Sequence, residues 1–265
     1  MPSVSNIAIG ANMAAAAANK ARHGMNESIA RLSTGVRAMY GGDAAGHSAG
    51  QALNAMSKSY AAATRNIEDG ISFAQMGESV LLEVANMGIR LHELGIAADN
   101  AALLDSNQIA ALNSEAAAIG DAIDALLDNT DFNEVPVVDS NATLQKNIAY
   151  AGLTANTTAV GPNIAITQMA GISTAAGADA TAKTMLGKVA EALGNIAADL
   201  TALKAFQGAA SATSANMAAA SARIIDTDFA LETADLTKNA ILNQAALSMA
   251  AQANNAQSAI LAVLQ

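Results

Sequence analysis

The sequence predicts a mainly α protein. Long antiparallel helices form a terminal coiled coil and a helical bundle, with a small β-hairpin element in the middle. Residues 3–135 contain no proline, and residues 209–265 contain neither proline nor glycine, the two residues that most often end helices. Alanine makes up about a quarter of the chain, well above ordinary usage, and lets helices approach closely. Aromatic residues are only 3% and tryptophan is absent, so a thin helix pair is favoured over a round core.

Three segments of the chain show a regular apolar spacing of three and four residues. Such spacing places the side chains on one stripe of a helix, as in the seam of a coiled coil. Three stripes of this kind can bury one another as a small bundle. The pattern is typical both of a monomeric bundle and of one that polymerises. The stripes are Val80, Val84, Met87, Leu91 and Leu94; Ile109, Leu112, Ala116, Ile119, Ile123 and Leu126; and Leu186, Val189, Leu193, Ile196, Leu200 and Leu203.

Short polar or glycine-containing segments separate the predicted helices. Residues 40–43 have the composition of a turn, and residues 99–106 that of a connection between helices. Residues 128–133 end the third helical run. The chain between residues 3 and 135 is therefore expected to form three helices joined by short connections.

The helical period is lost in the middle of the chain. Val135, Val137 and Val138 predict a short strand, and residues 141–172 alternate loosely around a turn at Gly161. One or two small β-hairpins are expected there, and helix resumes near Ala180.

Both ends of the chain lack charge but carry many amide side chains. No charged residue precedes Lys20, and none follows Lys238. The frequent Asn and Gln residues make these segments too polar for a membrane span, which needs roughly 20 predominantly apolar residues. They fit a packed protein environment in which amides pair with neighbours. Because one chain of this size would not bury both ends, the burial is expected to come from other copies.

Composition and motifs favour a structural role over catalysis. The formal net charge is −10, and no basic patch that would suit nucleic acid is present. There is no cysteine, and the three histidines are far apart in the sequence. His92 and Glu93 begin an H-E-x-x-H pattern, but Ile96 stands where the second histidine should be. We therefore predict no catalytic, cofactor-binding or metal-binding residues and no enzyme activity.

Several short segments, in order and position over about two-thirds of the chain, resemble bacterial flagellins. The matching segments are ARLSTGVR at 30–37, GDAAG at 42–46, RNIEDGIS at 65–72, TDFN at 130–133, ARIIDTDFA at 222–230, ILNQA at 241–245, AQAN at 251–254 and ILAVL at 260–264. The chain departs from the family pattern at residues 39–42, where relatives carry a longer polar run.

The resemblance implies a structural subunit that polymerises into the bacterial flagellar filament for motility. A hook–filament junction protein, which shares the terminal segments, is the alternative. In this family the two termini pair as a coiled coil in the filament core. The implied domains are residues 1–40 with 225–265 as terminal helices, 41–135 with 180–224 as a helical bundle, and 136–179 as a short β-containing insert.

Two sets of residues are candidate interaction sites. The apolar residues of the C-terminal segment are expected to form the polymerisation interface; they are Leu247, Ile260, Val263 and Leu264. In some flagellins, an Arg and a Glu-Leu pair contact the animal Toll-like receptor that senses flagellin, and Arg90, Glu93 and Leu94 match that pattern. The competing interpretation is a local ion pair between Arg90 and Glu93, with Leu94 packed in the bundle.

The resemblance also implies partners and a location. Besides copies of itself, the expected partners are a flagellar export chaperone, the hook–filament junction proteins and the cap proteins; nucleic acid and membrane are not expected. No basic segment precedes the apolar stretch at residues 7–18, so a cleaved signal peptide is not predicted. The protein is expected outside the cell, in the flagellar filament.

Overall fold

The computed structural model describes residues 2–37, 43–138, 145–150, 157–162 and 172–263. The chain divides into two compact units. Unit 1 comprises Met1–Ala55 and Met217–Gln265, and unit 2 comprises Met56–Asn216. Two long helices, α2 (Ala44–Ala98) and α4 (Ala178–Ile225), contribute residues to both units. The domain limits expected from the sequence remain a prediction.

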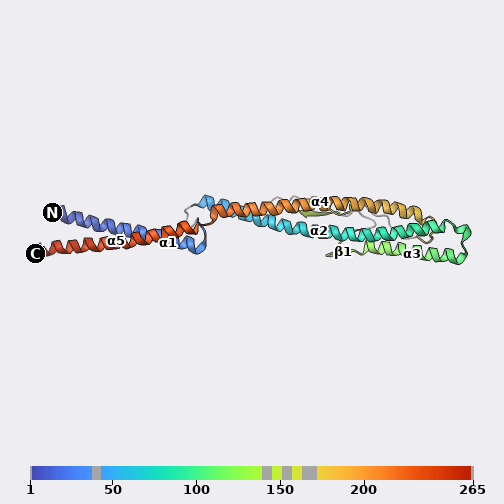
Figure 1. Cartoon of the computed structure of the whole chain (residues 1–265), viewed down its shortest axis with the longest axis horizontal. Coiled ribbons are helices and arrows are strands. Elements are labelled where there is room, and N and C mark those ends of the chain that lie inside the picture. Colours follow the sequence, from blue (N-terminus) through green and yellow to red (C-terminus); the bar gives the residue numbers. More distant parts are fainter. Residues whose placement is uncertain (1, 38–42, 139–144, 151–156, 163–171, 264–265) are drawn as a thin grey trace. The chain divides into compact units, whose positions relative to one another are not determined.

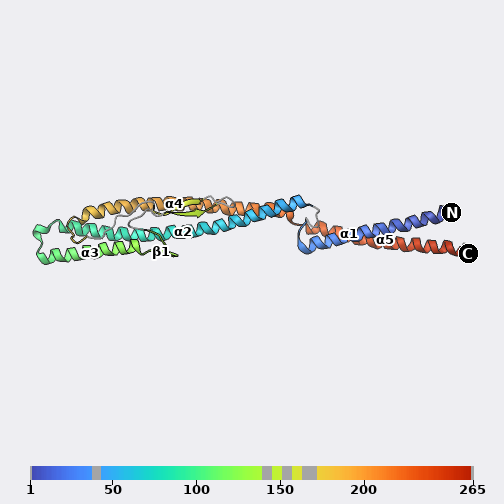
Figure 2. The same cartoon turned by 180° about the vertical axis from the view of Figure 1, so that it is seen from behind.

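Unit 1 is built around a pair of long helices from the two ends of the chain. α1 (Pro2–Thr34) and α5 (Phe229–Val263) lie side by side and antiparallel (Figures 1 and 2), so both termini lie at the same end of the pair. The side chains buried between them are small, as at Ala18, Ala21 and Ala246. Small residues let the two helix backbones approach closely.

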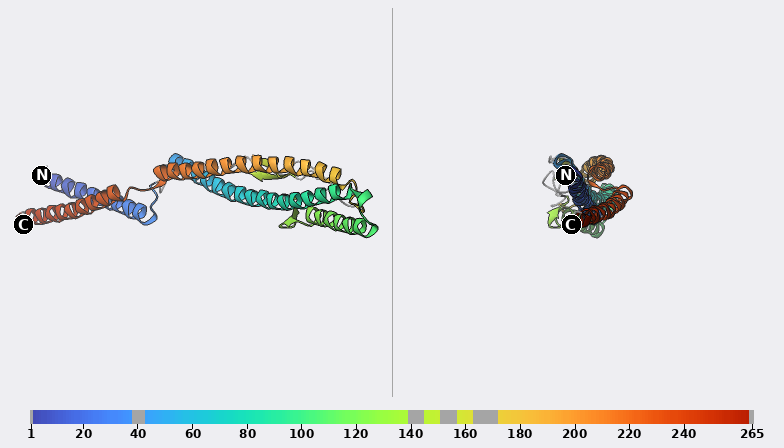
Figure 3. Two further views of the ribbon diagram at one scale, coloured as in Figure 1. Left: turned by 45° about the vertical axis from the view of Figure 1, so that its right-hand side comes forward. Right: turned by 90° about the vertical axis from the view of Figure 1, so that its left-hand side faces the viewer.

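Unit 2 is a bundle of three helix segments that run side by side (Figure 3). They belong to α2, α3 (Ser106–Asp128) and α4, and a short 3-10 helix, η1 (Ala101–Leu103), follows α2. Every residue of the three predicted apolar stripes is buried or half-buried, which confirms that these stripes form the core. The largest fully buried side chains include Ile67, Leu81, Leu91, Ile123, Leu127, Met185, Ile196 and Leu203.

The start of α3 follows from local side-chain chemistry. Asp105 accepts hydrogen bonds from the backbone amides of Asn107 and Gln108, at 2.7 and 2.9 Å. The Gln108 side chain accepts in return from the Asp105 amide at 3.0 Å, completing a capping box. The predicted connection between α2 and α3 is therefore confirmed, and Asp105 near its end caps the N-terminus of α3.

Two small antiparallel β elements accompany the bundle. β1 (Asp131–Phe132) pairs with β2 (Val135–Pro136), and β3 (Lys146–Ala149) pairs with β4 (Thr157–Val160). The turn between β1 and β2 is formed by Asn133 and Glu134, with φ of 52° and 62°. Positive φ at both positions is what a two-residue hairpin turn requires. The strand predicted over three valines includes only Val135; Val137 and Val138 follow it as buried core residues.

A carboxylate on α4 anchors the end of β4. The Gly161 amide donates a hydrogen bond to Asp199 at 3.0 Å, next to the fully buried Val160. Nearby, the ring of Tyr150 stacks on Phe206 with centroids 4.1 Å apart. Burial raises the pKa of Asp199 above its ordinary 3.8, and the hydrogen bond from Gly161 opposes that shift only in part. The charged form of Asp199 is therefore disfavoured by its surroundings.

The raised pKa predicts how unit 2 responds to pH and to substitution. Because folded Asp199 holds its proton more tightly than the unfolded chain does, its protonation stabilises the fold at low pH, and that stability is lost as pH rises through the folded pKa. Asp199→Asn keeps an acceptor for Gly161 without the charge, so we expect equal or greater stability at pH 7. Asp199→Ala leaves the Gly161 amide unpaired and should cost about 1 kcal/mol. Urea unfolding of both variants between pH 3 and 7 checks this; a less stable Asn variant at pH 7 would contradict it.

Candidate assembly surfaces

The terminal helix pair exposes many large apolar side chains. Scattered single exposures are normal in soluble proteins, but a concentration on one element marks an interaction surface. Within the described residues, α1 and α5 carry nine such side chains, each 49–69% exposed. They are Ile9, Met13, Ile29, Phe229, Leu231, Ile241, Leu242, Leu247 and Met249. An isolated subunit thus presents to water large apolar side chains of the kind that helices usually bury.

Two neighbouring grooves lie between α1 and α5. One has a volume of about 480 Å³ and the other about 290 Å³, and Met249 contributes to both. Their walls are mostly alanine and methylene groups, and Gly24 allows Asn239 to pack against the α1 backbone. The helix pair is therefore grooved as well as apolar, a shape that side chains of another helix can fill.

An ion pair joins the last turn of α1 to the first turn of α5. Glu232 of α5 is only 9% exposed, and the Arg31 guanidinium of α1 lies 3.6 Å from its carboxylate. A buried charge is costly unless it is paired. This pair therefore favours one register of α1 against α5.

Of the four residues predicted for polymerisation, the structure describes the side chain of Leu247 alone. Leu247 lies on α5 and is 54% exposed, so its side chain is available to another chain. Ile260 and Val263 lie within α5, but the described residues do not include their side chains. Leu264 lies outside the described residues. Their role in polymerisation remains a prediction.

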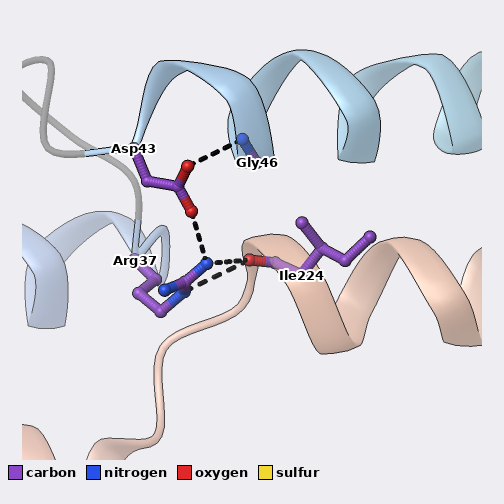
Figure 4. Close-up of polar contacts among 4 residues, drawn as sticks. All are labelled: Arg37, Asp43, Gly46 and Ile224. Atoms are coloured by element: carbon purple, nitrogen blue, oxygen red, sulfur yellow. Dashed lines mark hydrogen bonds and ion pairs between the residues drawn. The ribbon is translucent and has the colours of Figure 1, made fainter.

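A second feature of unit 1 is the junction at which four helix ends meet (Figure 4). The guanidinium of Arg37 donates to the Ile224 carbonyl from Nε at 3.2 Å and from a terminal nitrogen at 3.1 Å. The same terminal nitrogen contacts a carboxylate oxygen of Asp43 at 2.8 Å. The other oxygen of Asp43 accepts from the Gly46 amide at 2.8 Å. Arg37 thus caps the Ile224 carbonyl in the last turn of α4, where carbonyls lack helical partners, and holds the residue that caps α2.

Backbone hydrogen bonds reinforce this junction. The Arg37 amide donates to the Ile225 carbonyl at 2.7 Å, and the Thr227 amide donates to the Gly35 carbonyl at 2.9 Å. Val36 and Asp226 form an antiparallel bridge between them. Gly35 adopts a φ of 70°, which ends α1 in a conformation that glycine reaches without strain. The segment after α1 and the segment after α4 are therefore fastened to each other.

Asp43 makes the junction sensitive to acid. The hydrogen bond from Gly46 lowers the pKa of the Asp43 carboxyl below its ordinary 3.8, and Arg37 lowers it further. A depressed carboxyl pKa contributes stability that is complete above the unfolded pKa and is lost as pH falls through the folded pKa. The junction should therefore loosen below about pH 4, the range of an ordinary carboxyl pKa.

We expect Arg37→Met to open the junction while leaving unit 2 unchanged. Methionine keeps an unbranched apolar side chain but cannot cap Ile224 or pair with Asp43. The amides of Thr227 and Gly46 should exchange with solvent faster, which hydrogen exchange measures residue by residue. Arg22→Met, which removes an exposed cation of α1, is the matched control. Unchanged exchange at Thr227 in Arg37→Met would show that the backbone bonds alone hold the junction.

The candidate receptor residues form a compact ion cluster. Arg90 donates to Glu115 of α3 at 2.7 and 3.0 Å and to Glu93 at 3.1 Å. These carboxylates raise the pKa of Arg90 above its ordinary value, Glu115 most of all. Leu94 is only 3% exposed and packs in the core of unit 2. Arg90 and Glu93 are therefore at the surface, whereas Leu94 is not.

Within the part of the chain that the structure describes, no group of three or more His, Asp or Glu side chains could hold a metal ion. Across the same residues, no helix is both long and apolar enough to cross a membrane. Of the three histidines, His92 lies with Nδ1 3.2 Å from the Asp179 carbonyl, a contact between α2 and α4.

Sequence reasoning missed the junction and most of the exposed apolar residues. A signal for Asp43 was present, since an Asp directly before a helical run is a typical N-cap. No local signal links Arg37 to Ile224, which is 187 positions away. The exposed side chains of Ile9, Met13 and Leu231 look, in sequence, like any core residues of an apolar helix.

Comparisons with known proteins match almost the whole chain. The family description "Bacterial flagellin N-terminal helical region" matches residues 5–143, and "Bacterial flagellin C-terminal helical region" matches residues 177–264. A flagellin of Halalkalibacterium halodurans is 30% identical over 90% of this chain and 91% of its own length. A flagellin of Bacillus subtilis is 28% identical over 90% and 92%, and the flagellar filament core protein flaB2 of Brachyspira hyodysenteriae 27% over 91% and 92%.

Proposed function

This chain belongs to the bacterial flagellins, and we propose that its copies polymerise through the exposed apolar side chains of α1 and α5. It is a structural subunit of the flagellar filament, which serves motility. The alternative of a hook–filament junction protein is not favoured, because flagellins and a filament core protein match along nine-tenths of both chains.

One observation carries the proposed interface: nine large apolar side chains are exposed on two helices that have uncharged outer segments. Burying apolar surface contributes roughly 25 cal/mol per Å². Covering these side chains would therefore favour association. Because α1 and α5 of every copy expose the same side chains, further copies can cover them.

The missing charge supports the same arrangement. A homopolymer brings the same segment of every subunit to an equivalent position, so any charge there is repeated along the assembly. Repeated like charges in a buried position would oppose association. Although the chain carries a net charge of −10, residues 239–265 carry no charged side chain. The acidic residues thus lie outside residues 239–265 and do not oppose the packing of that segment.

Seeded growth tests the proposal directly. Monomeric protein, mixed with short filament fragments, should elongate them into filaments visible by electron microscopy, and fragments alone provide the control. Limited proteolysis of the monomer should trim residues from both ends, because helices gain most of their stability from packing. In filaments the same ends should be protected. Monomer that never extends the fragments would exclude the proposed polymerisation.

We propose an export chaperone, junction proteins and cap proteins as further partners of the terminal helices. Exposed Ile241, Leu242 and Leu247 on α5 support an export chaperone that covers this helix before assembly. Binding of junction and cap proteins would use the same terminal helices. Membership in the flagellins, a family of structural proteins, supports the absence of enzyme activity. For the Toll-like receptor, the pairing of Arg90 and the burial of Leu94 support the local structural role.

Export without a cleaved signal peptide also belongs to the proposal. α1 pairs with α5 over the apolar stretch at residues 7–18. A filament subunit that lost this stretch would lose part of the helix pair. N-terminal sequencing of filaments should therefore find no cleavage within or directly after residues 7–18.

A further inference from the structure

Two methionines of the terminal helices differ from the others in exposure. Among the eight methionines whose side chains the structure describes, only Met13 and Met249 are exposed, at 69% and 66%. Met185 is fully buried, and the remaining five are half-buried: Met25, Met56, Met76, Met87 and Met217. Because the chain has neither cysteine nor tryptophan, thioether sulfurs are the atoms that a peroxide oxidises most readily. A peroxide in water therefore reaches Met13 and Met249 before the other described methionines.

Both exposed methionines lie at one level of the helix pair. Met249 of α5 lines each of the two grooves between α1 and α5. In the smaller groove it shares the wall with Gly10 and Ala14 of α1. Met13 stands between these two residues in the sequence, on the same turn of α1. The two thioethers thus belong to one part of the surface that is proposed to be covered on assembly.

Oxidation would change the chemistry of this part of the surface. A thioether is apolar and adaptable, whereas a sulfoxide is polar and carries a strong hydrogen-bond acceptor. Apart from Gln252 and Met249, the smaller groove is lined only by glycine and alanine. A sulfoxide covered by another helix would find few donors there, and an unpaired buried acceptor is costly. Oxidised Met249 therefore opposes the packing that the thioether permits.

We propose that Met13 and Met249 form a peroxide-sensitive site whose oxidation stops the free subunit from assembling. The sulfur lone pair of each thioether attacks one oxygen of hydrogen peroxide, so an S–O bond forms as the O–O bond breaks. The leaving hydroxide takes the proton of the new S–OH group and departs as water. Each sulfur loses two electrons, which the peroxide gains. Because the site acts through the terminal helices, it rests on the proposed polymerisation.

The state of the subunit decides whether this site is accessible. In the free subunit both side chains are exposed to water. In the proposed polymer, further copies cover the exposed apolar side chains of α1 and α5, Met13 and Met249 among them. Peroxide should therefore act on subunits before they are incorporated. It should halt the growth of filaments without dissolving those already formed.

Mass spectrometry tests the selectivity of the reaction. Monomer is treated with dilute hydrogen peroxide, quenched with catalase and digested, and the oxygen gained by each methionine is followed over time. Met13 and Met249 should react at least about tenfold faster than buried Met185, because susceptibility follows exposure. In assembled filaments the same two residues should react more slowly than in the monomer. Equal rates at Met13, Met249 and Met185 in the monomer would overturn the proposed site.

Seeded growth tests the consequence for assembly. Oxidised wild-type monomer should need about a tenfold higher concentration to extend filament fragments, equivalent to 1.4 kcal/mol. Met13→Leu combined with Met249→Leu keeps apolar side chains of similar volume without sulfur. This variant should grow normally before and after peroxide treatment. Met25→Leu combined with Met217→Leu is the matched control, because it retains both exposed methionines and should stay sensitive to peroxide.

Two further measurements separate methionine oxidation from other damage. Methionine sulfoxide reductases for both sulfoxide epimers should restore the growth of oxidised wild-type monomer. Met249→Gln introduces a polar side chain of similar length without any oxidant, so it should raise the critical concentration, whereas Met249→Leu should not. Normal growth of Met249→Gln would contradict the part given to Met249.

The remaining outcomes distinguish this site from the proposed polymerisation. Oxidised wild-type monomer that grows like untreated monomer would overturn the site and leave the polymerisation intact. An equal loss of growth in the Met13→Leu, Met249→Leu variant would place the damage elsewhere and overturn the site as well. Untreated wild-type monomer that extends no fragments would remove the proposed polymerisation, and the role of the site with it.

Discussion

Deleting residues 239–265 should abolish filament formation while unit 2 keeps its helical fold. The deletion removes most of α5, including exposed Ile241, Leu242, Leu247 and Met249. It also leaves Ala18 and Ala21 of α1 without the helix that covers them. Unit 2 comprises Met56–Asn216 and contains no residue of α5. We therefore expect seeded growth to fall to zero, and the main unfolding transition of the bundle to stay at its wild-type temperature.

A single substitution tests whether assembly needs the exposed apolar side chains of α5 or only an intact helix. Leu247→Gln keeps a long, helix-compatible side chain but removes apolar surface from α5, so it should slow seeded growth and raise the critical concentration. Thr237→Gln, an exposed position just before the uncharged stretch, should assemble like the wild type. Normal filaments from the deleted chain would show that the polymer is held together elsewhere, for instance by the bundles alone.

Replacing Gly95 by alanine should strongly destabilise unit 2. A Cβ at this position would lie 2.8 Å from Cβ and 2.9 Å from Cα of Asp179, and it would also overlap the Asp179 amide nitrogen. Because part of the obstacle is backbone at the start of α4, it cannot move aside as a flexible side chain can. Overpacking of this kind typically costs about 1–3 kcal/mol. That exceeds the gain of up to about 1 kcal/mol from alanine's helix propensity.

The matched control is the same substitution at Gly187 on α4. A Cβ there would meet nothing within 4 Å, so Gly187→Ala should stabilise the free subunit by about 0.5–1 kcal/mol. Urea unfolding of monomers measures both variants against the wild type. If Gly95→Ala proved as stable as Gly187→Ala, α2 and α4 would not approach each other as closely as the structure shows.

The sequence alone determined the helices and much of the bundle core. Spacings of three and four are local properties, so the stripes through Val84, Ile123 and Ile196 predicted buried faces that the structure confirms. Helix ends were predictable where the signal was local, as at the polar connection before Asp105. The family was also readable, because its motifs lie in short segments at both ends of the chain.

Only the tertiary structure decided which apolar residues are covered and which are exposed. Leu82 and Val84 are similar in kind and two positions apart, yet one is half exposed and the other is fully buried. Likewise Gly95 and Gly187 are both helix-interior glycines, but only Gly95 lies against another backbone. The capping of Ile224 by Arg37 joins residues 187 positions apart. Each difference depends on which helices pack together across long stretches of sequence, and a local pattern carries no information about that.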